Sequence, residues 1–249
     1  MQRHVVEQWQ IRKPAVGSRA GMVASQHHLA STVGADILKR GGNAIDAAIA
    51  TGLALGTVEP WMSGIGGGGY MTVYLAREQR VRVVEFGMRA PFGASPDDYP
   101  LAGNGENAAD AFNWPKVVGD ANVEGPLSIA VPSYLRGIAL ALDQFGTRPF
   151  SELIDPACEF AEQGLPIDWF ASAKINHFAR PLARFEHTRQ TFLADGLPPP
   201  STWKAIFVTC PWEISALPIA ACSRTAPMRS SRGRWPSQSH GISRQSAPA

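Results

Sequence analysis

The stretch of this sequence most suggestive of chemistry is rich in glycine and runs from Ser63 to Tyr70, with four consecutive glycines at positions 66–69. Glycine adopts backbone angles that other residues avoid, and without a side chain it lets a ligand or another backbone come close. A phosphate-binding loop would be followed by Gly-Lys-Ser or Gly-Lys-Thr and a helix, whereas the residues from Tyr70 onward read as a strand. We therefore interpret the stretch as a place of close approach and not as a phosphate site.

Metal and thiol chemistry find little support in the sequence. Cys158, Cys210 and Cys222 form no CxxC pair and no cluster with histidine, and Cys158 is expected to be a small buried side chain. His27 and His28 have no third ligand within sequence range, so we expect them at a helix start or on the surface. The sequence predicts no metal and no cofactor.

Two helices are predicted just before the glycine-rich stretch. Apolar residues repeat with helical spacing within residues 24–43, and Gly41-Gly42 ends that pattern. Asn43 is a candidate N-cap for the second helix, with Asp46 at its third position, where an acid suits the helix dipole. The second helix carries apolar or small residues on every side, which predicts that it is buried.

Strands and further helices are predicted after the glycine-rich stretch. Residues 70–75 and 81–86 read as strands, and their short polar connection favours an antiparallel pair. Helices are expected at residues 134–145, 151–163 and 168–179. Trp61 and Met62 are expected in the core, and Asp195-Gly196 in a turn. This mixture indicates an α/β or α+β protein in which helices dominate after residue 130.

The overall composition is that of an ordinary globular protein. Of 249 residues, 45% are hydrophobic and 18% are charged, and the formal net charge is only +2. That balance indicates neither a nucleic-acid partner nor a charged membrane surface. The longest apolar stretch, residues 45–55, is too short to span a bilayer, and the first residues make a poor secretory signal. We expect a cytoplasmic protein, with the periplasm as the alternative that the resemblance below allows.

The composition changes near Pro200. Residues 201–249 carry six basic residues against one acid, Glu213, and hold nine serines, as many as the preceding 200 residues. When the third base of each codon is read with the first two of the next, starting at Pro198-Pro199-Pro200, synonymous codons exist that encode a sequence with helical apolar spacing and balanced charge. We therefore divide the chain into residues 1–200 and a tail, 201–249. We favour a frameshift in the proline run over a genuine basic, disordered tail.

A series of motifs occurs in a fixed order along residues 12–200. They are Gly21-Met22-Val23-Ala24-Ser25, Gly41-Gly42-Asn43-Ala44-Ile45-Asp46-Ala47-Ala48, Val58-Glu59-Pro60, the Ser63–Tyr70 stretch, Arg89-Ala90-Pro91, Ala130-Val131-Pro132 and Gly164-Leu165-Pro166. Together they resemble the large-subunit region of γ-glutamyltransferases, also called glutathione hydrolases.

The resemblance implies a partial N-terminal-nucleophile hydrolase fold, an αββα sandwich that is incomplete without a small subunit. Members cut themselves into two subunits, and the new N-terminal threonine of the small subunit attacks the γ-glutamyl amide with its own amine as base. Nothing in this chain matches that nucleophile. Thr202, Thr209 and Thr225 lie in the suspect tail and receive no role, so we expect no catalytic residue here.

Arg89 is the predicted substrate-binding residue. Many members of the family carry an Arg-Glu pair after the second strand, and that arginine holds the substrate α-carboxylate. Here Gly87 occupies the usual arginine position, and Arg89 stands two positions later. A guanidinium group remains well suited to bidentate carboxylate binding. The alternative is that Arg89 only pairs with an acid near the end of the strand.

Three functions remain open at this point. The first is transfer or hydrolysis of small γ-glutamyl substrates similar to glutathione, with the missing small subunit as partner and this chain alone inactive. The displaced arginine keeps open a second, acylase action on a glutaryl side chain of a β-lactam such as a cephalosporin. The third is a non-catalytic remnant with no activity of its own.

Overall fold

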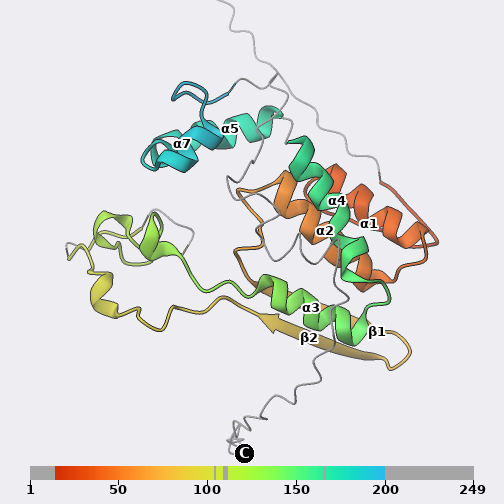
Figure 1. The fold of residues 1–249 in the computed structure, drawn as a ribbon. Coiled ribbons are helices and arrows are strands. Elements are labelled where there is room, and N and C mark those ends of the chain that lie inside the picture. Colours follow the sequence, from red (N-terminus) through yellow and green to blue (C-terminus); the bar gives the residue numbers. More distant parts are fainter. Residues whose placement is uncertain (1–14, 104, 109–111, 165–166, 200–249) are drawn as a thin grey trace, which may run out of the picture.

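The computed structural model describes residues 15–103, 105–108, 112–164 and 167–199, and Figure 1 shows their arrangement. A group of helices and a β-hairpin lie on one side, and shorter helices from the end of the described region lie on the other and contribute to the same apolar core. The predicted tail, residues 201–249, and Pro200 before it fall outside the described residues. No helix in the described part of the chain is long and apolar enough to cross a membrane.

The first two helices are α1 (His28–Lys39) and α2 (Ala44–Val58). The predicted stop of α1 is confirmed, since Gly41 takes a positive φ of 85° and Gly42 N donates to Ile37 O at 3.0 Å. The predicted start at residue 24 was too early. The side chain of His27 caps the helix by accepting from Leu29 N at 3.3 Å, which confirms the expected helix-start position.

Helix α2 is the centre of the helical group. Most of its residues are buried, as predicted from the apolar or small residues on all of its sides. Helices α1 and α4 (Phe150–Gln163) pack against it. Small residues permit the close approach, because a Cβ on Gly34 of α1 would lie 3.1 Å from Ala47 O of α2. Pro156 lies within α4 without ending it.

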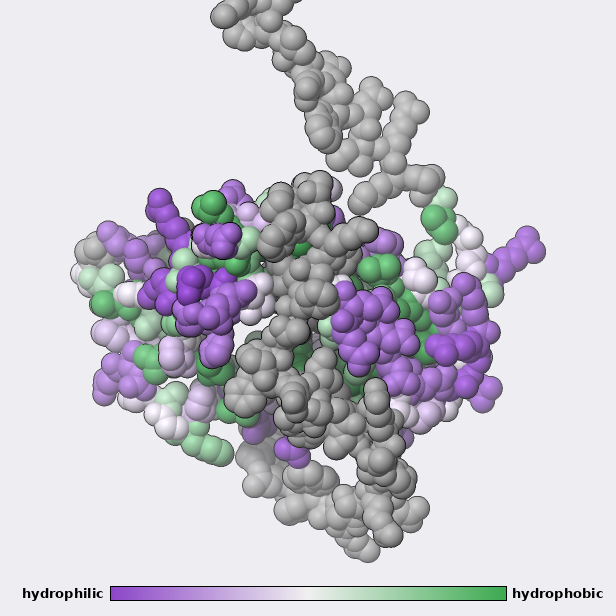
Figure 2. Space-filling view, turned by 45° about the horizontal axis from the view of Figure 1, so that its top comes forward, coloured by the Kyte–Doolittle hydropathy of each residue, from purple (hydrophilic) through white to green (hydrophobic). Residues whose placement is uncertain are grey.

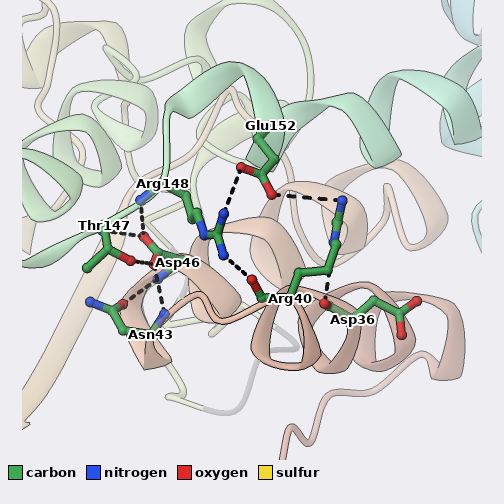
Figure 3. A network of polar contacts seen from close by, with 7 residues as sticks. All are labelled: Asp36, Arg40, Asn43, Asp46, Thr147, Arg148 and Glu152. Carbon is green, nitrogen blue, oxygen red and sulfur yellow. Dashed lines mark hydrogen bonds and ion pairs between the residues drawn. The ribbon is translucent and has the colours of Figure 1, made fainter.

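A network of hydrogen bonds joins α2 to the connection between α3 (Tyr134–Phe145) and α4 (Figure 3). The Asn43 side chain caps α2, and Asn43 N in turn donates to the Asp46 carboxylate at 2.8 Å, which confirms the predicted cap. The same buried carboxylate accepts from Thr147 N at 2.8 Å, from the Thr147 hydroxyl at 2.5 Å and from Arg148 N at 3.2 Å. Burial acts to raise the pKa of Asp46, but these hydrogen bonds outweigh it and hold the pKa below its ordinary value.

The polar faces of the outer helices are charged. Glu152 of α4 pairs with Arg40 after α1 and with Arg148, each at 3.8 Å. In Figure 2, hydrophilic residues lie on both the left and the right of the view, and the right is the side on which α1 and α4 lie in Figure 1.

The hairpin consists of β1 (Gly69–Leu75) and β2 (Arg80–Phe86), which pair antiparallel as predicted, with Gly69 opposite Phe86. Helix α3 (Tyr134–Phe145) covers one face of the hairpin. The buried side chains of that face are Val73, Val84 and Phe86. On the other face Tyr70, Tyr74, Val81 and Val83 are at least 60% exposed.

The last helices are shorter than expected. The predicted helix at 168–179 is α5 (Trp169–His177), capped by Asp168, and it is followed by α6 (Ala179–Ala183) and α7 (Glu186–Phe192), which the sequence pattern did not reveal. Asp195 and Gly196 form the predicted turn, with φ angles of 51° and 80°.

Of the two side chains predicted together in the core, Trp61 and Met62, one lies there. Trp61 packs against the core as expected, but Met62 is 62% exposed, so its predicted burial was wrong. Met62 lies in the turn that follows α2, where the chain leaves the core. Cys158 is only partly buried, at the edge of the apolar cluster.

Short 3₁₀ turns interrupt the long connection between β2 and α3. They are Pro96–Asp98, Val118–Asp120 and Pro126–Ser128.

Candidate functional site

An open pocket of about 1030 Å³ lies where β2 ends and α3 begins. Its lining combines apolar and charged side chains from three segments: the start of β1, the end of β2 with the residues after it, and the first turns of α3. Arg89, the predicted substrate-binding residue, is part of this lining.

The glycine-rich stretch holds these segments together. A Cβ on Gly68 would lie 2.5 Å from Phe86 O and 2.8 Å from Met88 N, so only glycine lets the loop pass the end of β2. Gly67 O accepts from both Ser133 N and Tyr134 N at 3.1 Å, which fixes the start of α3 to the same loop. The stretch is therefore a place of close backbone approach, as predicted.

Ser133 and Gly137 complete the junction, and the sequence pattern gave neither a role. The hydroxyl of Ser133 donates to Phe86 O at 2.5 Å and lies 3.1 Å from Gly87 O, so it serves as a tie between α3 and β2. Gly137 lies directly against the ring of Phe86, where any Cβ would overlap it. A glycine inside a helical pattern was the available signal for such a contact.

Arg89 is fixed through its backbone, and its side chain is exposed. Val131 N donates to Arg89 O at 2.8 Å, and Arg89 N approaches Val131 O at 3.5 Å, which makes an isolated antiparallel bridge. Among the described residues, the Arg89 guanidinium forms no ion pair or side-chain hydrogen bond. The alternative role, pairing with an acid at the strand end, therefore has no support within that part of the chain.

Two other charged residues line the pocket with Arg89. Glu85 lies at the end of β2, opposite Tyr70 in the hairpin register, and Arg136 is the third residue of α3. Sequence reasoning missed Arg136, because helical periodicity predicts only that such a residue faces outward. Its one distinguishing signal was its type, since a cation is unfavourable in the first turn of a helix.

A second group of titratable residues is coupled through Asp168, which acts on both Glu59 and His27; Glu59 is only 5% exposed. Burial raises the pKa of Glu59, and the charge of Asp168 adds to that rise. The pKa of His27 is lowered by burial and by His28, while Asp168 opposes this change. No cluster of three or more His, Cys, Asp or Glu residues able to hold a metal ion occurs in the described ranges.

The chain is similar to known proteins over most of its length. The family model for gamma-glutamyltranspeptidase matches residues 30–206. The glutathione hydrolase proenzyme of Bacillus subtilis (strain 168) is 43% identical over 178 residues, which cover 72% of this chain and 28% of that protein. The acylase ACY 1 proenzyme of Pseudomonas sp. (strain V22) is 41% identical over 188 residues, which cover 75% of this chain and 32% of that protein.

The chain is also similar to solved structures of gamma-glutamyltranspeptidases and related acylases. The gamma-glutamyltranspeptidase of Helicobacter pylori superposes with a TM-score of 0.65 and 31% identity, over 74% of this chain and 50% of that one. The cephalosporin acylase of Bacillus halodurans superposes with a TM-score of 0.65 and 26% identity, over 82% of this chain and 37% of that one. The chain thus spans about half of the first of these solved chains, and less than a third of the first curated relative.

Proposed function

This chain belongs to the gamma-glutamyltranspeptidase family, and on that premise we propose that it is the large-subunit portion of an enzyme that hydrolyses or transfers γ-glutamyl amides similar to glutathione. Its helices and hairpin form part of an N-terminal-nucleophile hydrolase fold. The partner in this proposal is the small subunit of the same precursor, which supplies the nucleophile and the oxyanion donors.

The observation that supports this proposal is the position of Arg89. Arg89 lines an open pocket with residues at the end of β2 and the start of α3, and its guanidinium has no ion-pair partner among the described residues. A guanidinium in that position can hold the α-carboxylate of a γ-glutamyl donor through two parallel hydrogen bonds.

The test uses an intact precursor that carries this segment. Arg89→Ala should raise the KM for a γ-glutamyl anilide by on the order of tenfold, the effect of losing one charge-assisted hydrogen-bonding partner. Self-cleavage, followed on a denaturing gel, should stay unchanged. Arg80→Ala is the matched control, because Arg80 is also exposed but lies at the far end of the hairpin from the pocket. Unchanged kinetics in Arg89→Ala would refute the assignment.

The chain by itself should be inactive in this proposal. A covalent mechanism without its attacking group loses the chemical route itself, so tight binding could not compensate. Thr202, Thr209 and Thr225 lie outside the described residues and have no assigned role. The purified chain should release no chromophore from a γ-glutamyl anilide above a mock purification, and release above that level would contradict the proposal.

Acylase action is the second candidate, favoured by a specific substitution. Gly87 stands where many family members carry the carboxylate-binding arginine, so the carboxylate of the substrate would be held from a different position. The ratio of kcat/KM for a γ-glutamyl anilide to that for a glutaryl anilide, measured on the intact precursor, separates the two candidates. A ratio well below one would favour acylase action.

The reading frame of the codons for residues 201–249 can be tested by sequencing the gene. We propose that residues 201–249 are read out of frame after the Pro198-Pro199-Pro200 run, because their charge and serine content differ from those of the preceding residues. Resequencing the DNA across these codons decides the question. A confirmed single-frame sequence, with no downstream small-subunit coding region, would instead support the non-catalytic remnant.

A further inference from the structure

The hairpin of β1 and β2 has one covered face and one exposed face. Helix α3 packs on the covered face, where Val73, Val84 and Phe86 are buried. The register places six side chains on the other face, which we call the outer face: Tyr70 opposite Glu85, Thr72 opposite Val83, and Tyr74 opposite Val81. All six residues are exposed, and no third strand joins the hairpin among the described residues.

The outer face does not have the composition of a face that only water covers. Where one side of an antiparallel sheet faces water, that side is ordinarily polar. Here Glu85 is the one charged residue of the six, and there is no lysine, the residue that commonly protects exposed strands from association. Tyrosine is enriched and lysine is depleted where proteins bind one another. The composition therefore indicates a surface that binds protein.

The size of the outer face fits a small interface. Its two tyrosines and two valines are each at least 60% exposed. A tyrosine can bury about 150–250 Å², so the six side chains together present roughly 500 Å². That area is near the upper end of the apolar patches on monomeric proteins, about 300–600 Å². Two such faces would bury about 1,000 Å², near the lower limit for a specific interface, so the expected association is weak and reversible.

The order of the layers favours a second copy of this chain as the partner. Each copy has α3 on the covered side of its hairpin and the outer face on the other side. Two hairpins packed face to face, about 10 Å apart, give the order helix, sheet, sheet, helix. This is the layer order of an αββα sandwich. A second copy can therefore supply the two layers that a single chain lacks.

Charge and side-chain shape favour one orientation of the two copies. A two-fold axis that runs between the hairpins, perpendicular to their strands, sets Val83 against Val83 of the second copy. It also sets Tyr70 against Tyr74 of the second copy, and aromatic pairs of this kind are favourable. The two Glu85 carboxylates then lie at opposite ends of the interface. An axis parallel to the strands would bring them to the same end, where they would repel each other.

We propose that the chain by itself forms a weak symmetric dimer through the outer face of its hairpin, with Val83 next to the two-fold axis. The occupant of the outer face is the same face of a second copy. The inference goes beyond the proposed function, because it concerns the chain without a small subunit and involves no catalytic step.

The test is analytical ultracentrifugation of the 249-residue chain at neutral pH. Between about 5 and 300 µM we expect a reversible equilibrium of monomer and dimer, with a Kd on the order of 10–100 µM. Val83→Lys places two like charges at the two-fold axis and should raise the Kd at least about tenfold. Val83→Glu should have the same effect.

A mixture of the two variants tests the symmetry of the contact. Because the axis sets position 83 against itself, equal amounts of the Val83→Lys and Val83→Glu chains should form a heterodimer, whereas each variant alone stays monomeric. Val123→Lys is the matched control, since Val123 is 64% exposed but belongs to the connection between β2 and α3. It should leave the Kd unchanged. Far-ultraviolet circular dichroism should be the same for all variants, because the substituted side chains are exposed.

Several results would overturn the inference. They are a chain that stays monomeric over the whole range, aggregates larger than a dimer, an unchanged Kd in Val83→Lys, an equal rise of the Kd in Val123→Lys, and a mixture of the two Val83 variants that stays monomeric. The turnover test of Arg89 in the intact precursor is a separate measurement. Its result stands whether or not the chain by itself forms a dimer.

Discussion

Replacing Asp46 by asparagine tests the junction between α2 and the connection that follows α3. The carboxylate is fully buried and accepts four hydrogen bonds, from Asn43 N, Thr147 N, the Thr147 hydroxyl and Arg148 N. Asparagine keeps the size and shape of the side chain but replaces one acceptor oxygen with a donor. The substitution therefore isolates hydrogen bonding and charge from packing.

The expected loss follows from which donors are left without an acceptor. If the new amide group takes the place of Oδ2, the Thr147 hydroxyl can rotate to accept from it, and Asn43 N loses its partner. If it takes the place of Oδ1, both Thr147 N and Arg148 N lose theirs. An orphaned buried donor costs about 1–3 kcal/mol, and loss of the negative charge weakens the remaining bonds. We expect Asp46→Asn to lower the free energy of unfolding by about 2–4 kcal/mol.

The assay is urea unfolding of the chain followed by far-ultraviolet circular dichroism at neutral pH. Asp36→Asn is the matched control. The Asp36 side chain is 48% exposed and pairs with Lys39 at 2.9 Å, so this change should cost less than about 1 kcal/mol.

Lowering the pH should reduce the difference in free energy of unfolding between the unaltered chain and Asp46→Asn. The folded-state pKa of Asp46 is lowered, so its contribution is complete above the unfolded value of about 3.9 and disappears as the pH falls through the folded value. A loss no larger than that of Asp36→Asn, or a difference independent of pH, would refute the reasoning.

Two further substitutions test other contacts. Gly137→Ala should lower the free energy of unfolding by about 1–3 kcal/mol, because the new Cβ overlaps the Phe86 ring, although alanine is otherwise the better helix former. Gly66→Ala has open space around it and should be mild; equal losses in urea unfolding would contradict this. Glu59→Gln should flatten the pH dependence of stability, because the pKa of Glu59 is raised in the folded chain. Its contribution is complete below the unfolded pKa of about 4.3 and is lost as the pH rises through the folded value. If the free energy of unfolding changed with pH by the same amount in the variant and in the unaltered chain from pH 4 to 8, this account would be wrong.

The parts of the fold that depend on neighbouring residues were predictable. The cap formed by Asn43 and Asp46 and the stop at Gly41-Gly42 are contained within a few residues, and the structure has both. The other partner of Asp46, Thr147, lies about a hundred positions away, and no local pattern contains it. The same limit applies to the pocket: Arg89 was predicted from the family resemblance, but its neighbours from β1 and α3 are distant in sequence and no local pattern links them to it.

The features that the sequence did not predict share a physical cause with one another: none leaves a local pattern. Arg136 was overlooked because periodicity separates buried from exposed positions and does not say which exposed residues share a pocket. Helices α6 and α7 have no fully buried residues, so they lack the apolar stripe by which a helix is recognised in sequence. Met62 was placed in the core from its type alone, and it lies instead in a turn.

The bridge between Arg89 and Val131 also bears on how enzymes of this architecture could change. It joins the two ends of the connection from β2 to α3, so residues 90–130 leave the hairpin and return to almost the same point. The free energy of closing a flexible loop depends only weakly on its length. This excursion could therefore be shortened, extended or grafted from a relative while the bridge, the hairpin and α3 remain in place. Such an exchange would alter what surrounds the arginine without rebuilding the scaffold that holds it.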